Sequence, residues 1–386
     1  MATITKTISK NATLGADSDT IQGAFDLCLD DGNDYDLQIL DLATYTEQAA
    51  LAARPAGGTV TLRSTAFYRD NRPTVTISGV DGALITARAS IIVKGIHFSY
   101  EENTYGSDYR YCIYVPSAVA KVNVSHCVIS MGGRYFWTPG TEYGHVGIWT
   151  VWNCTEVKVW NNIIRRCGFI GVRVDPSGSD TVEIYNNTFV KCQECIWIET
   201  FTDQRVSVWN NIFTMDPDWS VDCTKFYVIW AEDNQPLTRL KRLDYNCYDW
   251  RNTGLALETW AYDQKNHSYR KSRLADVQGL GLEANGIEVA AEYCTYCSDY
   301  HLKPASPCVN ASDTATDPSD DADGVARGDA IGAYVGLCGA TPQAGVQFDA
   351  KQNDTYWYRM TCQNSKRRTG LDTERNRVVL DTVRIL

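Results

Sequence analysis

The stretch "VEIYNNTFVKC", from Val182 to Cys192, decides the fold because two neighbouring stretches repeat it. They are "VKVWNNIIRRC", from Val157 to Cys167, and "VSVWNNIFTMD", from Val206 to Asp216. The three copies begin 25 and 24 residues apart, and an earlier copy begins at Val122, 35 residues before the first of them. Self-similarity at such a period is typical of solenoids, in which each repeat packs only on its neighbours.

Each copy begins with an apolar–polar–apolar alternation, which predicts a half-buried strand. A second apolar alternation precedes each copy, and no helical pattern separates the two. The sequence therefore predicts one turn of a coil, here called a rung, per repeat, and an all-β fold: a right-handed single-stranded parallel β-helix. The predicted second strands are Cys112–Val115, Val146–Trp149, Gly171–Val174, Cys195–Ile198 and Tyr227–Trp230.

The Asn-Asn pairs have a structural explanation in such a coil. Tight turns between its faces favour residues that tolerate left-handed backbone angles, and asparagine does so better than other non-glycine residues. We expect Asn162, Asn187 and Asn211 to stack inward as a hydrogen-bonded ladder, with Asn246 as its extension. Cys167 and Cys192 share a rung position and predict a small apolar stack.

Composition restricts the classes of function. The chain has 386 residues, 44% of them hydrophobic, and a formal net charge of −11, which argues against nucleic acid as a partner. No apolar run is long enough to span a membrane. The first residues lack the apolar core of a secretory signal, so we expect the 14 cysteines to be mostly reduced.

The two ends of the coil need covers, because they expose unpaired strand edges. Residues 17–32 predict an amphipathic helix with Asp19 as its N-cap, and Thr44–Arg54 predict a second helix. The predicted domains are an N-terminal capping segment with short helices (1–58), the β-helix (59–340) and a C-terminal extension (341–386).

Registering the second strands maps one outward face. If Ile148, Val172, Ile196 and Ile229 point inward, the next residues form an outward stripe, and a column of carboxylates lies two positions further along. The stripe consists of Trp149, Arg173, Trp197 and Trp230, and the column of Asp175, Glu199 and Glu232.

Three interpretations of this face remain open. Carboxylates on adjacent or alternate rungs match the separations used by retaining and inverting glycosidases, and aromatic rings with Arg173 suit an acidic sugar. The same stripe could bind a glycan without hydrolysing it. Aromatic residues and arginine are also enriched at protein–protein interfaces, and acids are ordinary on a solvated strand face.

Metal and cofactor signals are weak. The acidic stretch Asp317–Gly324 lacks the glutamate of an EF-hand loop. A zinc site would need four converging ligands, and Cys294, Cys297, His301 and Cys308 have no standard spacing for one. The sequence predicts no metal and no cofactor.

The C-terminal extension differs in composition from the coil. From Arg359 to Leu386 it has seven basic and three acidic residues. One interpretation is a solvated tail. The other is an anchoring or oligomerisation arm that docks on an acidic neighbour, because the segment also carries aromatic and apolar residues. The residues assigned to the arm are Trp357, Arg359, Lys366, Arg367 and Arg368.

Two resemblances add to this interpretation. The stretch Asp299–Ser312, with "DAIGAYVG" at Asp329–Gly336, resembles the closing rung of the pectate-lyase-like superfamily, whose catalytic signatures are not found here. The opening "MATITKTI" and the Asn-rich rungs resemble β-helix virion proteins of tailed bacteriophages.

The second resemblance implies a virion structural protein, displayed as a head decoration or spike-like appendage and acting by binding. Its implied partners are capsid or other virion proteins, a surface glycan, and further copies of the chain, with a trimer as one option. The alternative is a polysaccharide-degrading or glycan-binding β-helix.

Overall fold

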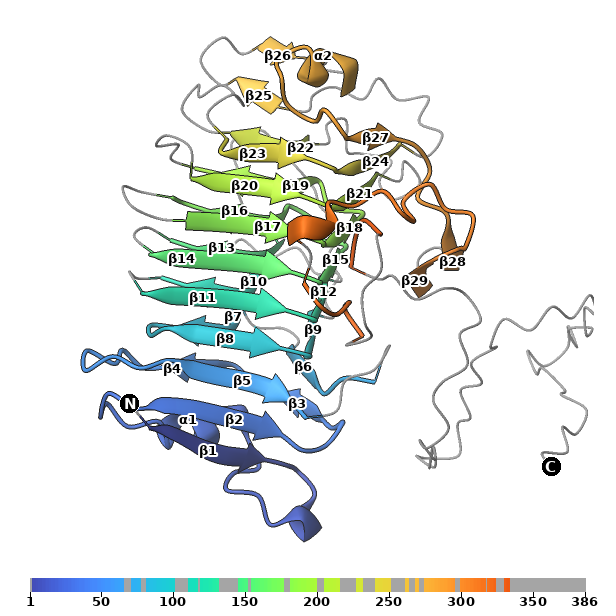
Figure 1. The fold of residues 1–386 in the computed structure, drawn as a ribbon. Coiled ribbons are helices and arrows are strands. Elements are labelled where there is room, and N and C mark those ends of the chain that lie inside the picture. The colour runs from blue at the N-terminus through green and yellow to red at the C-terminus, as the bar shows by residue number, and fades with distance from the viewer. Residues whose placement is uncertain are drawn as a thin grey trace, which may run out of the picture. The chain divides into compact units, whose positions relative to one another are not determined.

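In the computed structural model the chain is a parallel β-helix. The structure describes residues 2–65, 71–77, 81–100, 110–116, 119–131, 145–151, 154–176, 181–199, 205–215, 227–231, 240–250, 261–263, 268–270, 274–295, 299–316, 318–323 and 330–333. Three sheets of nine strands each run along the coil, and Figure 1 shows their strands stacked one above another. All strand pairs inside the coil are parallel except the last pair of one sheet.

Sheet A begins at the N-terminal end of the coil and holds the strands whose pattern defines the repeat. Its strands are β1 (Thr3–Ile8), β2 (Asp34–Ile39), β5 (Val60–Ser64), β8 (Ile91–Lys94), β11 (Lys121–Ser125), β14 (Glu156–Trp160), β17 (Thr181–Tyr185), β20 (Val206–Trp209) and β23 (Arg242–Asp244).

Sheet B follows the Asn-Asn turns. Its strands are β3 (Thr44–Thr46), β6 (Thr74–Ile77), β9 (His97–Tyr100), β12 (Val128–Met131), β15 (Ile163–Arg165), β18 (Thr188–Val190), β21 (Ile212–Met215), β24 (Cys247–Trp250) and β27 (Ile287–Glu288).

Sheet C contains the predicted second strands. Its strands are β4 (Ala49–Leu51), β7 (Gly82–Ala87), β10 (Arg110–Val115), β13 (His145–Thr150), β16 (Ile170–Val174), β19 (Glu194–Ile198), β22 (Tyr227–Ala231), β25 (Ala261–Asp263) and the antiparallel β26 (Ser268–Arg270). The prediction of an all-β parallel β-helix is confirmed.

The turns between sheets A and B use the asparagine pairs in two ways. The first residue of each pair, at Asn161, Asn186 and Asn210, has a φ of 54°, the left-handed region that asparagine tolerates. The second residue points into the core, where Asn162 and Asn187 are fully buried. In each of these repeats the first asparagine therefore adopts the left-handed backbone conformation of the turn, and the second places its side chain in the core.

The N-terminal end differs from the prediction. Within residues 2–65 the only α-helix is α1 (Ile21–Asp26), which is capped by Thr20 rather than Asp19. A short 3-10 turn, η1 (Ala12–Leu14), precedes it. Thr44–Arg54, predicted as a helix, instead contains β3 and β4. Pairing with β6 and β7 outweighs the helix propensity of this Ala-rich stretch. Strands of the coil thus begin at Thr3, well before residue 59.

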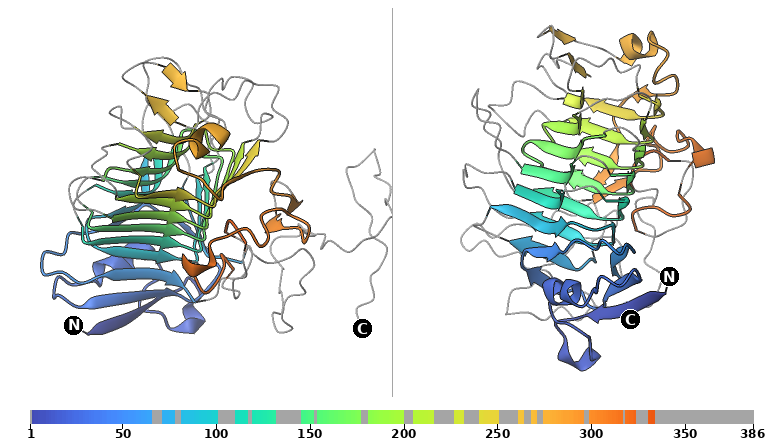
Figure 2. Two further views of the ribbon diagram at one scale, coloured as in Figure 1. Left: turned by 45° about the horizontal axis from the view of Figure 1, so that its top comes forward. Right: turned by 90° about the vertical axis from the view of Figure 1, so that its left-hand side faces the viewer.

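The predicted closing rung is also wrong, because this part of the chain does not continue the coil. After the short helix α2 (Leu274–Gln278) and the strand β27, the chain turns back along the outside of sheet B (Figure 2). The described parts of residues 289–333, which follow β27, are called the C-terminal strap. It contains β28 (Tyr293–Thr295) and β29 (Asp299–Leu302), which pair only with each other, and the 3-10 turn η5 (Thr314–Thr316).

The C-terminal strap buries an apolar column on the outer face of sheet B. Val128, Ile163 and Ile212 point outward there, yet each is at least nine-tenths buried. Strap residues such as Leu302 and Ile331 pack on them in one cluster. The outer faces of sheets A and C therefore remain as the candidate binding faces.

Small residues in sheet C are required by close approach of the coil's layers. A Cβ atom added at Gly171 would lie 2.6 Å from the carbonyl oxygen of Cys195 and 3.0 Å from the Phe189 ring. We expect Gly171→Ala to lower the free energy of unfolding by about 2–3 kcal/mol, because the backbone atom cannot move away cheaply. Urea unfolding measures this, with Thr61→Ala on the outer face of sheet A as the control, expected within about 0.5 kcal/mol of the parent.

Candidate functional site

The residues of the outward stripe of sheet C are paired across neighbouring strands as the sequence predicts. Trp149 pairs with Arg173, Arg173 with Trp197, and Trp197 with Trp230. The stripe extends one strand further, because Tyr114 pairs with Trp149 and their ring centroids are 5.2 Å apart. The four predicted residues of the binding face therefore lie side by side on successive strands.

Within the stripe the side chains stack on one another. The guanidinium carbon of Arg173 lies 4.3 Å from the Trp149 ring centroid and 4.4 Å from that of Trp197. The rings of Trp197 and Trp230 stack at 5.2 Å. Such cation–π and stacking contacts stabilise the column. They also use the ring faces that a bound sugar would need, and Trp197 is only 5% exposed.

The candidate carboxylates are also engaged in the protein's own structure. Glu199 forms an ion pair with Arg173, and both side chains are largely buried. Asp175 is 4% exposed. The hydrogen bonds from Asp175 N to Thr150 O and from Glu199 N to Val174 O place the two residues on adjacent rungs. Glu232 lies outside the described residues. A general acid would therefore have to be released from an ion pair or from burial before it could act.

Sheet A carries a second aromatic stack, which was not among the predicted site residues. Trp160, Tyr185 and Trp209 occupy one outward column, with interplanar angles of 4° and centroid distances of 6.0 and 4.4 Å. Arg242 covers Trp209 and forms an ion pair with Asp313 of the C-terminal strap at 2.5 Å. The feature of the sequence that could have predicted this stack is the aromatic residue before each Asn-Asn pair.

The asparagine ladder runs through the coil beside this stack. The Asn162 side chain donates to Asn187 Oδ1 at 3.0 Å, Asn187 to Asn211 at 3.1 Å, and Asn211 to Asn246 at 3.1 Å. Each Oδ1 also accepts the backbone N–H of the preceding ladder residue. The ladder ends at Glu283, whose carboxylate accepts from Asn246 Nδ2 at 2.6 Å and from the Tyr248 hydroxyl.

Glu283 gives the ladder a dependence on pH. Burial raises the pKa of this carboxyl from 4.5 to about 7, although its hydrogen bonds to Tyr248 and Asn246 oppose the shift. Between these two values the folded chain binds more protons than the unfolded chain. The free energy of unfolding should therefore fall as pH rises from about 4.5 to 7, by about 3 kcal/mol.

The measurement is urea unfolding at a series of pH values with the parent and Glu283→Gln. The glutamine variant cannot ionise, so its stability should lack this fall. An identical pH dependence in both proteins would show that Glu283 titrates normally in the folded state.

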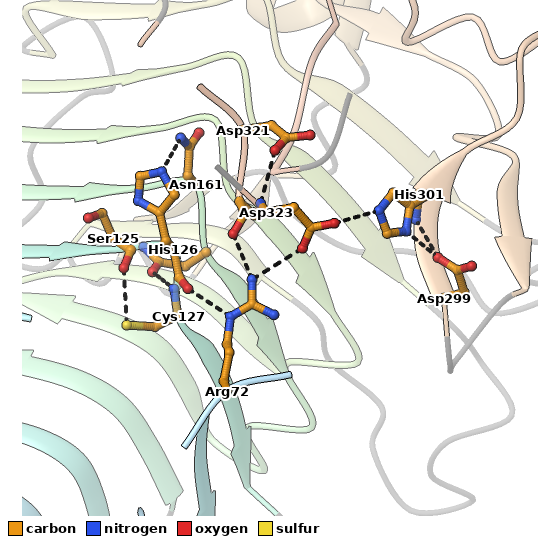
Figure 3. Close-up of polar contacts among 11 residues, drawn as sticks. Arg72, Ser125, His126, Cys127, Asn161, Asp299, His301, Asp321 and Asp323 are labelled. Atoms are coloured by element: carbon orange, nitrogen blue, oxygen red, sulfur yellow. Dashed lines mark hydrogen bonds and ion pairs between the residues drawn. The ribbon is translucent and has the colours of Figure 1, made fainter. Parts of the chain in front are cut away.

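A polar cluster fixes the C-terminal strap to the coil (Figure 3). Asp323 lies between Arg72 and His301, at 3.5 Å from the Arg72 guanidinium and 2.9 Å from His301 Nε2. The other ring nitrogen of His301 contacts Asp299 at 2.5 Å. Burial alone would lower the pKa of His301, but the hydrogen bonds to both aspartates raise it to about 9. His301 is therefore cationic at neutral pH, and together with Arg72 it balances the carboxylates of Asp299 and Asp323.

Arg72 reaches the strap from the segment before β6. Its side chain is 0% exposed, and it donates to the carbonyl oxygens of His126 at 3.0 Å and Ala322 at 2.6 Å. Nearby, His126 Nε2 lies 3.2 Å from Asp320. These contacts hold strap residues against the turns of the coil, and their geometry is that of a structural clamp.

The remaining predicted sites have different outcomes. Cys294 is disulfide-bonded and so is no thiolate ligand, while Cys297 lies outside the described residues. No three His, Cys, Asp or Glu side chains of the described ranges converge as a metal site.

No helix in the described part of the chain is long and apolar enough to cross a membrane. The arm residues Trp357, Arg359, Lys366, Arg367 and Arg368 lie outside the described residues.

Comparisons with known proteins agree with this architecture. A family model described as a right handed beta helix region matches residues 46–213. Together with the three parallel sheets, this match identifies the fold as a right-handed parallel β-helix. Neither the curated proteins nor the solved structures contain a match.

Proposed function

We propose that this chain is a structural protein of a tailed-bacteriophage particle, displayed on the outside as a head decoration or a spike-like appendage. In this proposal the coil works by binding and carries out no chemistry. Capsid or other virion proteins are its partners, and the virion is its location. The resemblance of the opening residues and of the Asn-rich rungs to such proteins supports the proposal.

One observation carries the preference for a binding role over a catalytic one. Arg173 is stacked between Trp149 and Trp197 and paired with Glu199. The aromatic rings and the carboxylate that a sugar could have contacted are therefore already occupied by Arg173 of the same chain. A rigid coil with internally paired outer columns is suited to projecting from, or cementing, a particle.

The test is recovery of the chain with particles from its source. Particles are banded on a density gradient and their peptides counted by mass spectrometry. Recovery near the copy number of the major capsid protein indicates a decoration, and a few copies per particle indicate a spike or fibre. Absence from banded particles that retain their other proteins contradicts the proposal.

A polysaccharide-degrading or glycan-binding role is the second candidate. The observation that favours it is the placement of Asp175 and Glu199 on adjacent rungs beside aromatic side chains. Adjacent strands are about 4.8 Å apart, which is close to the carboxyl separation of about 5–5.5 Å in retaining glycosidases. Release of reducing ends from bacterial capsule or a pectin-like polymer would support it. The activity should then disappear in both Asp175→Ala and Glu199→Ala, while Lys158→Ala on sheet A should retain it.

A further inference from the structure

The N-terminal end of the coil carries an open strand edge. The strand β1 is the end strand of sheet A, and among the described strands it pairs with β2, with one further bridge from Ile8 to Ser18. Carbonyl oxygens of Ala2 and Ile8 accept hydrogen bonds from the β2 side. Thr7 faces the opposite way: its N–H donates to Asp17 at 2.8 Å and its carbonyl accepts from Ser18 at 3.1 Å.

Backbone groups of alternate residues point to the same side of a strand. The N–H and C=O groups of Thr3 and Thr5 therefore point away from β2, as those of Thr7 do. No strand of the described part of the chain pairs with this edge at Thr3 and Thr5, and both side chains are exposed. Figure 1 shows β1 as the last strand at the blue end of the stack. Such an edge is a template for a further strand.

Exposed apolar side chains gather at the same end. Among the described residues five large hydrophobic side chains are exposed, and four of them precede residue 43. Leu27 and Leu29 lie in the connection from α1 to β2. Leu14 and Leu42 lie beyond the C-terminal ends of β1 and β2, with Leu29 at 62% and Leu42 at 52% exposure. Exposed apolar side chains therefore precede β2 and follow both β1 and β2, and such a concentration is typical of an interaction site.

This end is also acidic. Residues 1–42 contain eight aspartates and two lysines, a formal net charge of −6. Lys6 is paired with Asp17 at 3.3 Å, and Arg54 and Arg63 from later in the chain are paired with Asp31 and Asp36. Adding these two arginines to the count changes −6 to −4, so this end keeps an excess of acids. A partner strand should therefore be basic and carry apolar side chains.

We propose that the N-terminal end of the coil is a docking site for an extended, basic segment, which adds to β1 as a further strand of sheet A. The occupant is Arg375–Leu386 of a second copy of this chain. That segment, "RNRVVLDTVRIL", has three arginines, one aspartate and six Val, Ile or Leu residues. Its main-chain groups pair with Thr3 and Thr5, its arginines face the aspartates, and its apolar residues cover the leucines.

The docking is head-to-tail, because the two copies contribute different surfaces. Such a contact closes into a ring or continues as an open chain. It concerns self-association in solution, so its experiment is independent of whether the protein is found on virus particles. A failed result here leaves the particle proposal standing, and the reverse also holds.

The experiment is sedimentation velocity of the full-length chain over a concentration series. We expect reversible association that weakens in ~0.5 M salt, where charge attraction is screened. A synthetic peptide with the sequence of residues 375–386 should compete with it, and a scrambled peptide of the same composition should not. The edge is tested with Thr5→Pro, which removes an N–H that β2 does not use and is tolerated on an edge strand.

Thr5→Pro should weaken association about tenfold, the equivalent of one lost hydrogen bond. Thr5→Val retains the N–H and should associate like the parent. Leu29→Ser should also weaken association, without touching β1. Thermal unfolding checks that each variant is folded. A chain that stays monomeric at every concentration overturns the proposal. So does association that is unaffected by both Thr5→Pro and Leu29→Ser.

Discussion

Asn187→Ala should lower the free energy of unfolding by about 3–5 kcal/mol. The side chain is 0% exposed, and its Nδ2 donates to the Val159 and Tyr185 carbonyl oxygens and to Asn211 Oδ1. Its Oδ1 accepts two hydrogen bonds from Asn162. Alanine would remove these five hydrogen bonds from the core, while Asn211 Oδ1 would keep its bond from the backbone N–H of residue 187. Each buried polar group left without a partner costs about 1–3 kcal/mol.

Urea unfolding of the parent and variant gives this difference. The control is Lys158→Ala in the same part of the coil, where a half-exposed ion pair with Glu183 at 3.2 Å is lost. Exposed ion pairs contribute about 0–1 kcal/mol, so this variant should be nearly neutral. Equal destabilisation by the two substitutions would show that the ladder does not hold the rungs together.

Arg72→Leu should lower the free energy of unfolding by about 3–5 kcal/mol, because the buried Asp323 would lose Arg72 and keep His301 alone of these two cationic partners. The carboxylate is 2% exposed and the arginine 0%. The two carbonyl oxygens that accept from Arg72 would lose those bonds as well. We also expect the C-terminal strap to become sensitive to proteases, since Arg72 ties it to the coil.

Arg63→Ala is the matched control, because Arg63 also pairs with an aspartate, Asp36, at 2.7 Å, yet its side chain is 37% exposed. Loss of that pair should cost under about 1 kcal/mol. Limited proteolysis with peptide mapping follows the strap directly. If Arg72→Leu leaves both stability and the cleavage pattern of the strap unchanged, the polar cluster is no clamp.

The features predicted from sequence are those set by the repeat itself. A period of 24 or 25 residues fixes which positions stack, so the inward ladder of Asn162, Asn187 and Asn211 follows from alternation alone. The register of Trp149, Arg173, Trp197 and Trp230 follows in the same way, because a parallel strand repeats its neighbour's orientation. The alternation of apolar and polar residues is therefore sufficient to predict both the ladder and the register of the stripe.

The features missed depend on contacts that the repeat does not encode. The C-terminal strap packs on rungs more than a hundred residues earlier, and its cluster with Arg72 spans 251 residues. The apolar outward positions Val128, Ile163 and Ile212 were a signal that something covers sheet B. Strand register makes Arg173 a neighbour of Trp149 and Trp197, but it does not determine the side-chain conformations. The stacking of Arg173 and its ion pair with Glu199 could therefore not be predicted from the sequence.

Electron cryomicroscopy of intact particles from the source tests the central claim most directly. We expect density for a parallel β-helix that fits the coil, with its three sheets, on the outer surface of the head or at the tail tip. Particles whose surface density is resolved and entirely assigned to other chains would contradict it.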